Sequence, residues 1–519
     1  MCGICGAISI SKNKDKITLR NLNKISQLIA SRGPDVKKNW QDPNKKIALI
    51  VHRLSTQGLS NNSNQPCYSY NKEVISIMNG EIFNHKSIRK ELIQKGYKFY
   101  TDNDTETVSN SFHFWGKKFI KKLEGQFAIF TYNLKKNQGL LIRDEHGISP
   151  LFYLVKNKKL FFSSTEDSLN FQLNKKIELN NKTLADFIIS GSATKNCSIF
   201  SNIKQLEPGH YLQISHDKIV GKSKSFYNFK PNQKSKKINI RNTQKQIYKN
   251  LYSKVYERSS GNKNFGIFLS GGFDSTLILA LLKKNYPKKK IITFTASFED
   301  PKNKRLIGEH HIVQKICKHF KCKNIIVPIR GKDLIKNLGT YSSPESGILE
   351  YCNRLLAKEA KRNNIDVILS GEGSDEMFLG YDHNLSIIGL INKKFLFLRK
   401  KFKLRALSQN KLSKNSKIED FFLIGGADLD LEKKRKEVFS QKMINQESLT
   451  KTISNYIKSY KLRNPNDFHK IAFLLDYQVK IPNVQLRRAE GPSMAEGVEM
   501  RFPFLNNELK KIVYNTPLN

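Results

Sequence analysis

A strand, a glycine-rich turn and a helix follow one another twice in the second half of the chain, and this arrangement constrains the fold more than any other feature. The two copies are "FGIFLSGGFDSTLILALLKK" (265–284) and "IDVILSGEGSDEMFLGY" (365–381). Between them, apolar runs at 289–298 and 324–329 alternate with a helical pattern at 309–321. This alternation predicts an α/β domain with a parallel sheet that carries helices on its faces. Ligands on such sheets bind at the carboxyl ends of the strands, where both glycine-rich turns lie.

The first half follows a different pattern. Short apolar runs such as "KIALIVHRLS" (46–55) and "EVISIMNGEIF" (73–83) are separated by Lys- and Asn-rich turns, which is typical of antiparallel strands. Helical periodicity is interspersed, as in "ITLRNLNKISQLIASR" (17–32). With 519 residues, the chain is long enough for more than one domain. The expected organisation is an α+β domain (2–215), a polar linker (216–246) and an α/β domain (247–519).

The first glycine-rich turn, "LSGGFDS" (269–275), has the composition of an anion-binding loop. Ser270, Gly271 and Gly272 leave backbone N–H groups unobstructed ahead of a helix, and such groups bind phosphate together with the helix N-terminus. The turn is not a Walker A loop, because the terminal Gly-Lys-Ser/Thr is missing. It contains Asp274 instead, and an acid beside a phosphate site indicates a bridging Mg²⁺. For this segment taken alone, a simple strand-to-helix turn is the alternative.

The second turn, "SGEGSDE" (370–376), strengthens that interpretation. It places Glu372, Asp375 and Glu376 at the end of another predicted parallel strand. Three carboxylates at one strand end repel each other unless a cation or a reactive role keeps them there. A nucleotide–Mg²⁺ site assembled from both turns explains the pair better than two unrelated loops.

The N-terminal "MCGICG" raises a separate possibility. If Met1 is removed, Cys2 carries its thiol and a free α-amine on the same carbon, and that amine titrates near pH ~8. A thiol beside its own base is a self-contained nucleophile. The alternatives are a small buried cysteine or, together with Cys5, half of a metal or redox motif. The other residues that suggest a metal cluster are Cys317, Cys322, His310, His311 and His319.

The net charge of +45 invites a nucleic-acid interpretation. The lysines are scattered along the whole chain, however, and no zinc-finger spacing or RNA-binding signature accompanies them. We therefore expect no specific nucleic-acid partner. The odd number of cysteines, 7, the lack of a secretory leader and the lack of a long apolar run predict a cytoplasmic protein with no membrane segment.

Taken together, these motifs resemble those of a known family. "SGGFDS" is similar to the pyrophosphate-binding loop of ATP pyrophosphatase domains, and "SGEGSDE", "EGVEMRFPFL" and "MCGICG" resemble the glutamine-hydrolysing asparagine synthetases. The first half resembles the class II glutamine amidotransferases, which have a four-layered αββα N-terminal-nucleophile fold. The motifs that carry this likeness are "RGPD", "HRLS", "NGEIFN", "DNDTE", "EGQFA" and "RDEHGISPL", in that order.

The resemblance implies roles for residues of the first half. Cys2 would attack the side-chain amide of glutamine, with its own α-amine moving the proton. Asn79 and the Gly80 backbone N–H match the family's oxyanion hole, where fixed dipoles stabilise the tetrahedral intermediate. Arg53 matches the residue that pairs with the glutamine α-carboxylate. The residues that match the groups holding the glutamine ammonium are Glu81 and Asp104.

In the second half, the resemblance implies an ATP site with Mg²⁺ bound by Asp274 and Asp375. Glu372 matches the carboxylate needed to form and aminate an acyl-adenylate. Ammonia would cross an internal channel, shielded from water, and displace AMP from the activated acceptor. The residues that match the ATP-binding positions are Leu269, Ser270, Gly271, Gly272, Asp274, Ser275, Ala296, Ser370 and Gly371.

Two departures qualify this expectation. The chain ends at residue 519, soon after "RFPFL" (501–505), whereas the relatives continue, so we expect full glutaminase capacity and impaired adenylation. The segments 341–356 and 486–502 also resemble divergent relatives that amidate other carboxylates. Aspartate is the first choice of acceptor, a different carboxylate is the alternative, and a homodimer is possible. A regulatory protein on a degenerate scaffold is a further alternative, which the intact motifs disfavour.

Overall fold

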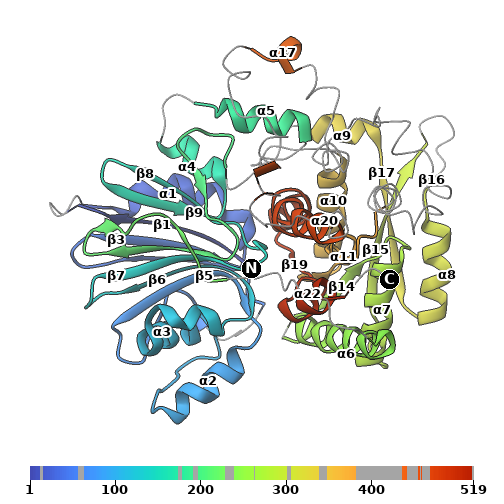
Figure 1. Ribbon diagram of the computed structural model, residues 1–519, viewed down its shortest axis with the longest axis horizontal. Helices are drawn as coiled ribbons and strands as arrows, with labels where there is room; N and C mark the ends of the chain where they lie inside the picture. Colours follow the sequence, from blue (N-terminus) through green and yellow to red (C-terminus); the bar gives the residue numbers. More distant parts are fainter. Residues whose placement is uncertain are drawn as a thin grey trace.

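The computed structural model describes residues 1–11, 16–56, 63–173, 178–190, 197–227, 239–261, 263–300, 306–337, 348–381, 435–440, 454–455, 458 and 468–516. The two halves of the chain form two domains that lie side by side, with the N-terminus where they meet (Figure 1). Of the predicted acceptor segment 341–356, residues 341–347 fall outside the described residues.

Within the described residues, the first domain contains two antiparallel sheets. The strand order is β10-β8-β9-β1-β3-β2 in the first and β12-β11-β7-β6-β5-β4 in the second, where β13 also pairs with β11. The strands of the first sheet are β1 (Cys2–Ser9), β2 (Val36–Gln41), β3 (Ile47–Arg53), β8 (Phe152–Lys156), β9 (Lys159–Ser163) and β10 (Lys204–Gln205). Those of the second are β4 (Cys67–Tyr68), β5 (Val74–Ile82), β6 (Gly125–Asn133), β7 (Gln138–Arg143), β11 (His210–Ser215), β12 (Lys218–Ile219) and β13 (Lys224–Ser225).

These sheets pack face to face and are covered by helices. All residues of β1 and β3 are buried, because one face of their sheet packs on the second sheet and the other packs on helices. Helices α1 (Leu19–Leu28) and α4 (Glu166–Leu173) cover the first sheet, and α2 (His85–Gln94) and α3 (Asp104–Trp115) cover the second (Figure 1). The resulting layers, helix–sheet–sheet–helix, confirm the predicted αββα fold.

The second sheet continues beyond residue 215. Strands β12 and β13 lie inside the interval 216–246 that the sequence assigns to the linker, and both pair with β11. Helix α6 (Ile240–Ser259) also begins inside that interval. Two-residue strands carry no periodicity that a sequence pattern can register.

The second domain contains the predicted parallel sheet. The strand order is β16-β15-β14-β18-β19, with β17 also paired to β15, and each pairing except β15–β16 is parallel. The strands are β14 (Phe265–Phe268), β15 (Ile292–Glu299), β16 (Leu306–Ile307), β17 (Lys323–Ile329), β18 (Val367–Leu369) and β19 (Glu499–Arg501). Because β14 and β18 are neighbours, the two glycine-rich turns that follow them lie at the same sheet edge.

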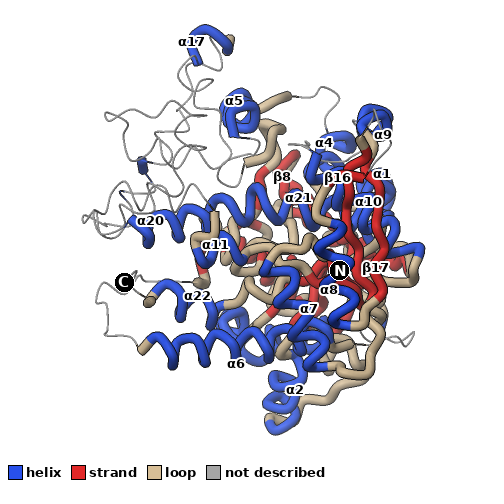
Figure 2. The backbone as a smooth tube through the Cα atoms, turned by 90° about the vertical axis from the view of Figure 1, so that its right-hand side faces the viewer, coloured by secondary structure: helices blue, strands red, loops and turns tan. Residues whose placement is uncertain are grey.

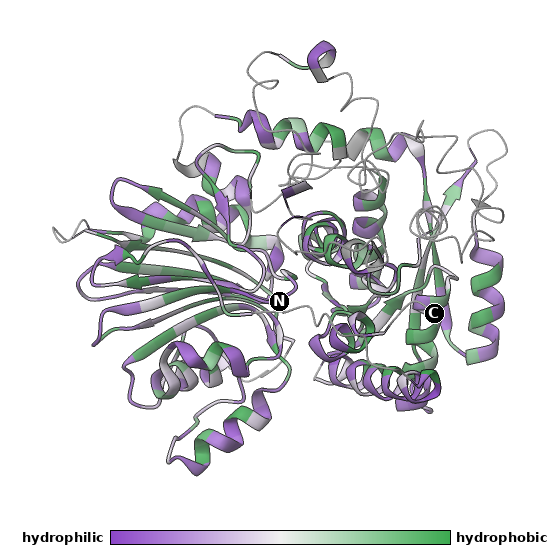
Figure 3. Ribbon diagram, viewed as in Figure 1, coloured by the Kyte–Doolittle hydropathy of each residue, from purple (hydrophilic) through white to green (hydrophobic). Residues whose placement is uncertain are grey.

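Helices cover both faces of this sheet, and apolar residues follow its strands, whereas α6 on the outside is largely hydrophilic (Figure 3). Helix α22 (Asn507–Tyr514) lies along α6 (Figure 2), where Asn250 Nδ2 donates to Glu508 Oε2 at 2.9 Å. The other helices are α5 (Asn181–Ser190), α7 (Phe273–Asn285), α8 (His310–Phe320), α9 (Gly331–Asn337), α10 (Ile348–Arg362), α11 (Ser374–Phe378), α17 (Arg435–Val438), α20 (Phe468–Leu475), the π-helix η6 (Asp476–Gln485) and α21 (Leu486–Ala495). None of the helices in the described part of the chain has the length and apolarity that crossing a bilayer requires.

Buried ion pairs cross the boundary between the domains. Removing one partner of such a pair leaves an uncompensated charge and costs roughly 3–5 kcal/mol, so these contacts constrain how the domains sit against each other. The pairs are Arg32 with Glu490, Glu81 with Arg501, Glu145 with Lys510, and Glu166 with Arg487.

Candidate active site

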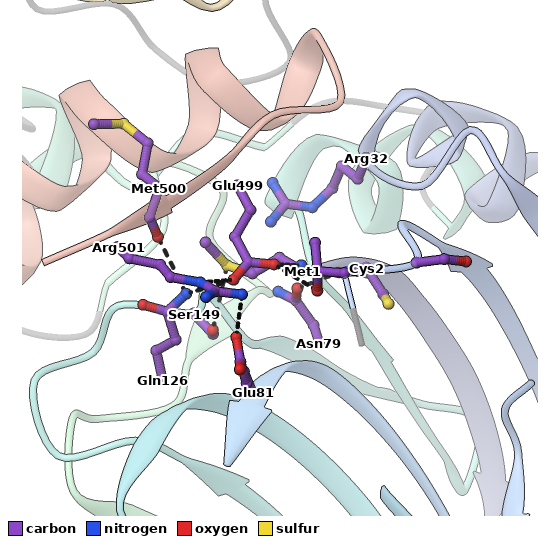
Figure 4. Close-up of polar contacts among 12 residues, drawn as sticks. Met1, Cys2, Arg32, Asn79, Glu81, Gln126, Ser149, Glu499, Met500 and Arg501 are labelled. Carbon is purple, nitrogen blue, oxygen red and sulfur yellow. Dashed lines mark hydrogen bonds and ion pairs between the residues drawn. The ribbon is translucent and has the colours of Figure 1, made fainter. Parts of the chain in front are cut away.

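Cys2 begins β1 at the junction of the two domains and is 4 % exposed. Pairing of β1 with β3 sets Cys2 opposite Arg53, and the Cys2 backbone N–H donates to Asn79 Oδ1 on β5 at 2.8 Å. The encoded Met1 precedes it, and the Met1 ammonium contacts the Glu499 carboxylate (Figure 4). The two facing sheets thus bring a thiol, a guanidinium and an amide together from separate strands.

Asn79 and Gly80 have the geometry expected of an oxyanion hole. Asn79 is fully buried, and because its Oδ1 accepts from Cys2, its Nδ2 is left without a hydrogen-bond partner. Buried donors are normally satisfied, so an unpartnered amide beside a thiol indicates a place for an anionic oxygen. Gly80 has φ +131°, and a Cβ there would lie 1.9 Å from the Gln126 carbonyl oxygen, so this position requires glycine.

The thiol of Cys2 needs a base. Burial raises its pKa above the ordinary value, although the N-terminal ammonium, a backbone hydrogen bond from Leu54 and Arg53 act in the opposite direction. The thiolate, not the thiol, is the nucleophile. An α-amine on the same residue, with an ordinary pKa of ~8, meets this requirement once Met1 is absent.

Two carboxyl groups lie in the same buried region. Burial raises the pKa of Asp104 to about 6, although a backbone N–H from Ile82 stabilises its ionised form at 2.8 Å. Burial also raises the pKa of Glu81 to about 8, against the opposing effect of Arg501. These acids are 6 % and 2 % exposed, so an ammonium group that reached them would favour their ionised forms and would then be held with little screening by water. Arg53 Nη1 donates to Asn64 Oδ1 at 2.9 Å nearby.

The motif "RDEHGISPL" supports this region, and its Ser149 Oγ contacts Met1 Sδ at 3.7 Å (Figure 4). The Arg143 guanidinium donates to the carbonyls of Gly147, Ser149 and Leu206 at 2.7 to 3.1 Å. Asp144 accepts from backbone N–H groups of the same loop, including that of Ser149 at 2.9 Å. The conformation of the loop between β7 and β8 therefore depends on these two side chains.

The first glycine-rich turn is pre-shaped in the second domain. Ser270 Oγ lies 3.1 Å from Ser275 Oγ and accepts from the Gly272 N–H at 3.3 Å, and Gly272 caps α7. Gly271 has φ +88°, a conformation that glycine adopts without strain. The predicted anion-binding turn thus lies at a helix N-terminus, a position that favours phosphate.

The second turn lies directly against the first. Ser374 Oγ donates to Asp274 Oδ1 at 2.7 Å, and a Cβ on Gly371 would be 3.1 Å from the Cβ of Asp274. Burial raises the pKa of Asp375, and the nearby Asp274 raises it further. Burial raises the pKa of Glu372 to about 7, and neighbouring carboxylates add to the effect. The structure therefore brings the two glycine-rich turns, 269–275 and 370–376, and their carboxylates into one site.

Leu269 directly follows β14, and Ala296 lies in the carboxyl half of its neighbour β15. The Leu269 N–H donates to the Phe294 carbonyl at 2.9 Å, and Thr295 Oγ1 donates to the Leu269 carbonyl at 2.8 Å. Leu269 is 1 % exposed and Ala296 is partly buried beside the same core. Their backbone is positioned next to the first turn, as expected for the side of a nucleotide pocket.

The two halves match two family models. Residues 1–227 match the glutamine amidotransferase domain, and residues 246–519 match asparagine synthase. The chain belongs to the asparagine synthase family. It is a glutamine-dependent amidating ligase that uses ATP.

Relatives share moderate identity with this member of the asparagine synthase family. It is 27% identical to asparagine synthetase [glutamine-hydrolyzing] 1 of Bacillus subtilis, over 100% of this chain and 81% of that protein. It is 28% identical to asparagine synthetase [glutamine-hydrolyzing] 2 of the same organism, over 74% of this chain but only 53% of that protein. Among solved structures, glutamine phosphoribosylpyrophosphate amidotransferase from B. subtilis matches with a TM-score of 0.32 and 13% identity, over 71% of this chain and 81% of that one.

The acidic turns fit the magnesium of a Mg-ATP complex. No group of three or more potential protein ligands for a metal is present in the described part of the chain. Mg²⁺ bound with a nucleotide needs only one or two carboxylates, because phosphates and waters complete its coordination. Asp274 and Asp375 are near enough for Asp274 to raise the pKa of Asp375, and together they supply that number. A dication between them also offsets the repulsion that raises the pKa of Asp375.

Two charged residues of the site were not predicted. Glu499 and Arg501 lie in the motif "EGVEMRFPFL", but neither was among the site residues predicted from the sequence. Both are buried, and the Arg501 guanidinium contacts the Glu81 carboxylate across the domain boundary (Figure 4). Gln126 Nε2 and Thr56 Oγ1 donate to the Glu499 carboxylate at 3.3 and 3.2 Å. Their sequence context, "VEMRF" (498–502), places two opposite charges among apolar residues, and buried charges need partners. This pattern could have indicated that both residues form buried ion pairs.

Proposed function

We propose that this protein makes asparagine from aspartate, taking nitrogen from glutamine and consuming ATP with release of AMP and pyrophosphate. Aspartate is the proposed acceptor because the chain belongs to the asparagine synthase family and has both acidic turns of the nucleotide site. The reaction divides into two halves, one in each domain.

In the glutaminase half, removal of Met1 frees the α-amine of Cys2. That amine accepts the thiol proton as sulfur attacks the side-chain amide of glutamine, and the Asn79 Nδ2–H and Gly80 N–H groups stabilise the resulting oxyanion. The amine then returns the proton to the departing nitrogen, ammonia leaves, and water hydrolyses the thioester to glutamate. Arg53 pairs with the α-carboxylate of glutamine, and Glu81 and Asp104 hold its ammonium.

In the synthetase half, the backbone N–H groups of the first turn hold the phosphates of ATP, with Ser270, Ser370 and Gly371 beside them. A carboxylate oxygen of aspartate attacks the α-phosphorus, pyrophosphate departs, and the β-carboxyl becomes an aspartyl-AMP ester. Ammonia attacks the ester carbonyl, and AMP leaves with its electron pair. Glu372, with a pKa raised to about 7 by burial, accepts the proton that the new amide nitrogen loses. Mg²⁺ at Asp274 and Asp375 would neutralise phosphate charge.

One observation supports the proposal above the others. The structure combines a thiol beside an unpartnered buried amide with a second, paired acidic site. Hydrolysis of glutamine alone needs no such second site, and ammonia released into water would be protonated before it could react.

The decisive assay is incubation of the full chain with glutamine, Mg-ATP and aspartate. The proposal predicts asparagine, glutamate, AMP and pyrophosphate in equal amounts. Glutamate without AMP would show that the second site does not adenylate an acceptor. AMP formation with a different carboxylate and none with aspartate would replace the proposed acceptor but keep the reaction class.

A further inference from the structure

Arg501 ends β19 and contacts the glutamine site with its side chain. The guanidinium contacts the Glu81 carboxylate, and its Nε donates to Glu499 Oε1 at 2.8 Å (Figure 4). Nη1 donates to the carbonyls of Arg258 and Ser260 at 2.8 and 3.2 Å. With 2 % exposure, the side chain is held by two carboxylates and two carbonyls that come from both domains.

The main chain of the same residue contacts the nucleotide site. The Arg501 carbonyl accepts from the Ser370 N–H at 3.0 Å, because β19 and β18 are parallel neighbours. Ser370 begins the second acidic turn, and its Oγ accepts from the Glu372 N–H at 3.3 Å. Further along the turn, Ser374 bonds to Asp274 of the first turn at 2.7 Å. Movement of the Arg501 backbone therefore acts on the turn that carries Glu372.

The ammonium of glutamine and the Arg501 guanidinium compete for one carboxylate. Both cations are drawn to Glu81, and in a buried region each such interaction is strong. Glu499 offers the guanidinium a second partner, since Arg501 Nε already donates to Glu499 Oε1 at 2.8 Å. Although burial opposes its ionisation, the pKa of Glu499 is lowered, and Arg501 contributes to that lowering independently of Met1. The guanidinium therefore has an ionised carboxylate to which it can shift when glutamine arrives.

We propose that Arg501 is a positioning residue that couples glutamine binding at Glu81 to nucleotide binding at the Ser370 turn. This rests on the proposed function, because it takes Glu81 as the ammonium-binding group and the Ser370 turn as part of the ATP site. A nucleotide that displaces the Ser370 turn also displaces the end of β19 that is hydrogen-bonded to it, and this moves the guanidinium away from Glu81. Mg-ATP then strengthens glutamine binding, and by linkage glutamine strengthens Mg-ATP binding by the same factor.

The test measures binding of glutamine to the full chain carrying Cys2→Ala, which binds without turnover. Calorimetric titration with and without Mg-ATP should show the Kd of glutamine falling by about fivefold or more when Mg-ATP is present, the lower end of ordinary coupling. In Cys2→Ala/Arg501→Gln, the ratio should fall to about 1, since no guanidinium then competes for Glu81. Arg501→Lys, which keeps the charge but lacks the planar fork of donors, should also lower the ratio, and it replaces the Gln variant if that variant does not fold.

Arg32→Gln is the matched control, because Arg32 forms another buried cross-domain ion pair, with Glu490, that does not include β19. It should keep the parent ratio. The inference is overturned by a ratio of 1 in the parent, by an undiminished ratio in the Arg501 variants, or by equal loss in Arg32→Gln. Its failure differs from failure of the proposed function, since asparagine and AMP can form while the two ligands bind independently.

Discussion

The glutamine site and the nucleotide site differ in how much of each is in place before a ligand arrives. Cys2 and Asn79, at 4 % and 0 % exposure, sit on long strands inside two packed sheets. The nucleotide turns lie at strand ends, where Phe273 of the first turn is 95 % exposed. One site is built into the core of its domain, and the other is open at the edge of its sheet.

This difference follows from the chemistry proposed for each site. An oxyanion is stabilised best by dipoles that are already fixed, since reorienting them during the reaction costs free energy. A phosphate site instead uses open N–H groups and a cation that arrives with the nucleotide. We therefore expect variants of the glutamine site to lower the rate of glutamine hydrolysis. The activity of the nucleotide site should instead depend on the bound nucleotide and Mg²⁺.

Replacing Cys2 should have the largest effect. Cys2→Ala should lower glutamine-dependent amidation at least about 10³-fold, because no other group can form the thioester. Amidation supplied with ammonium salt should persist, since the second site is untouched. Quantifying asparagine with each nitrogen source checks this.

Cys5→Ala is the matched control. Cys5 lies on the same strand and is fully buried, but it belongs to the core between the first sheet and its helices. Its variant should keep glutamine-dependent activity within a few-fold. If Cys2→Ala still turned over glutamine, the proposed nucleophile would be wrong.

Removing the metal should separate the two sites most cleanly. Chelation with EDTA should lower amidation by about 10²- to 10³-fold, since Mg²⁺ charge stabilisation amounts to several kcal/mol. Glutamine hydrolysis, measured as glutamate released, should not change. Restoring Mg²⁺ should recover amidation, and parallel loss of both activities would contradict the separation.

Removing the oxyanion donor comes next. Asn79→Ala should lower kcat for glutamine hydrolysis by about 10²-fold with little change in KM, because Nδ2 acts on the intermediate rather than on bound glutamine. Steady-state kinetics on the folded variant measures this split. A rise in KM at unchanged kcat would instead make Asn79 a ground-state binding group.

The smallest predicted effect is a pH dependence. The pKa of Asp104 is about 6, so this acid is largely protonated at pH 5 and ionised at pH 7. Only the ionised form attracts the ammonium of glutamine, so ionisation of Asp104 should contribute about a tenfold rise in kcat/KM for glutamine from pH 5 to pH 7. This adds to the rise that deprotonation of the Cys2 amine, with an ordinary pKa of ~8, produces. Asp104→Asn should remove this step, with its pKa of about 6, and leave only the rise due to the amine. A pH profile that keeps the step in the variant would assign it to another group.

Local motifs predicted much of this molecule, because the residues that matter there are close in sequence. The turn at Ser270 and the turn at Glu372 follow apolar strands directly, so a parallel sheet places both at the same edge. That β14 and β18 are neighbours, which brings the turns into contact, follows only from the structure. The predicted fold class is confirmed, because the periodicity of strands and helices is also a local feature of the sequence. Arg501 was missed because its partner, Glu81, lies in the other domain, and only tertiary packing makes them neighbours. The predicted linker, 216–246, includes β12 and β13 of the first domain, because two-residue strands leave no periodic pattern in the sequence.

The central claim is that nitrogen released at Cys2 becomes the amide made at the second site. The most direct measurement supplies amide-¹⁵N glutamine, Mg-ATP and aspartate in a solution of excess unlabelled ammonium, followed by mass spectrometry of the product. The account predicts ¹⁵N in the amide of asparagine well above its share of free ammonia. A product whose label matches the free ammonia pool, or no asparagine at all, would contradict it.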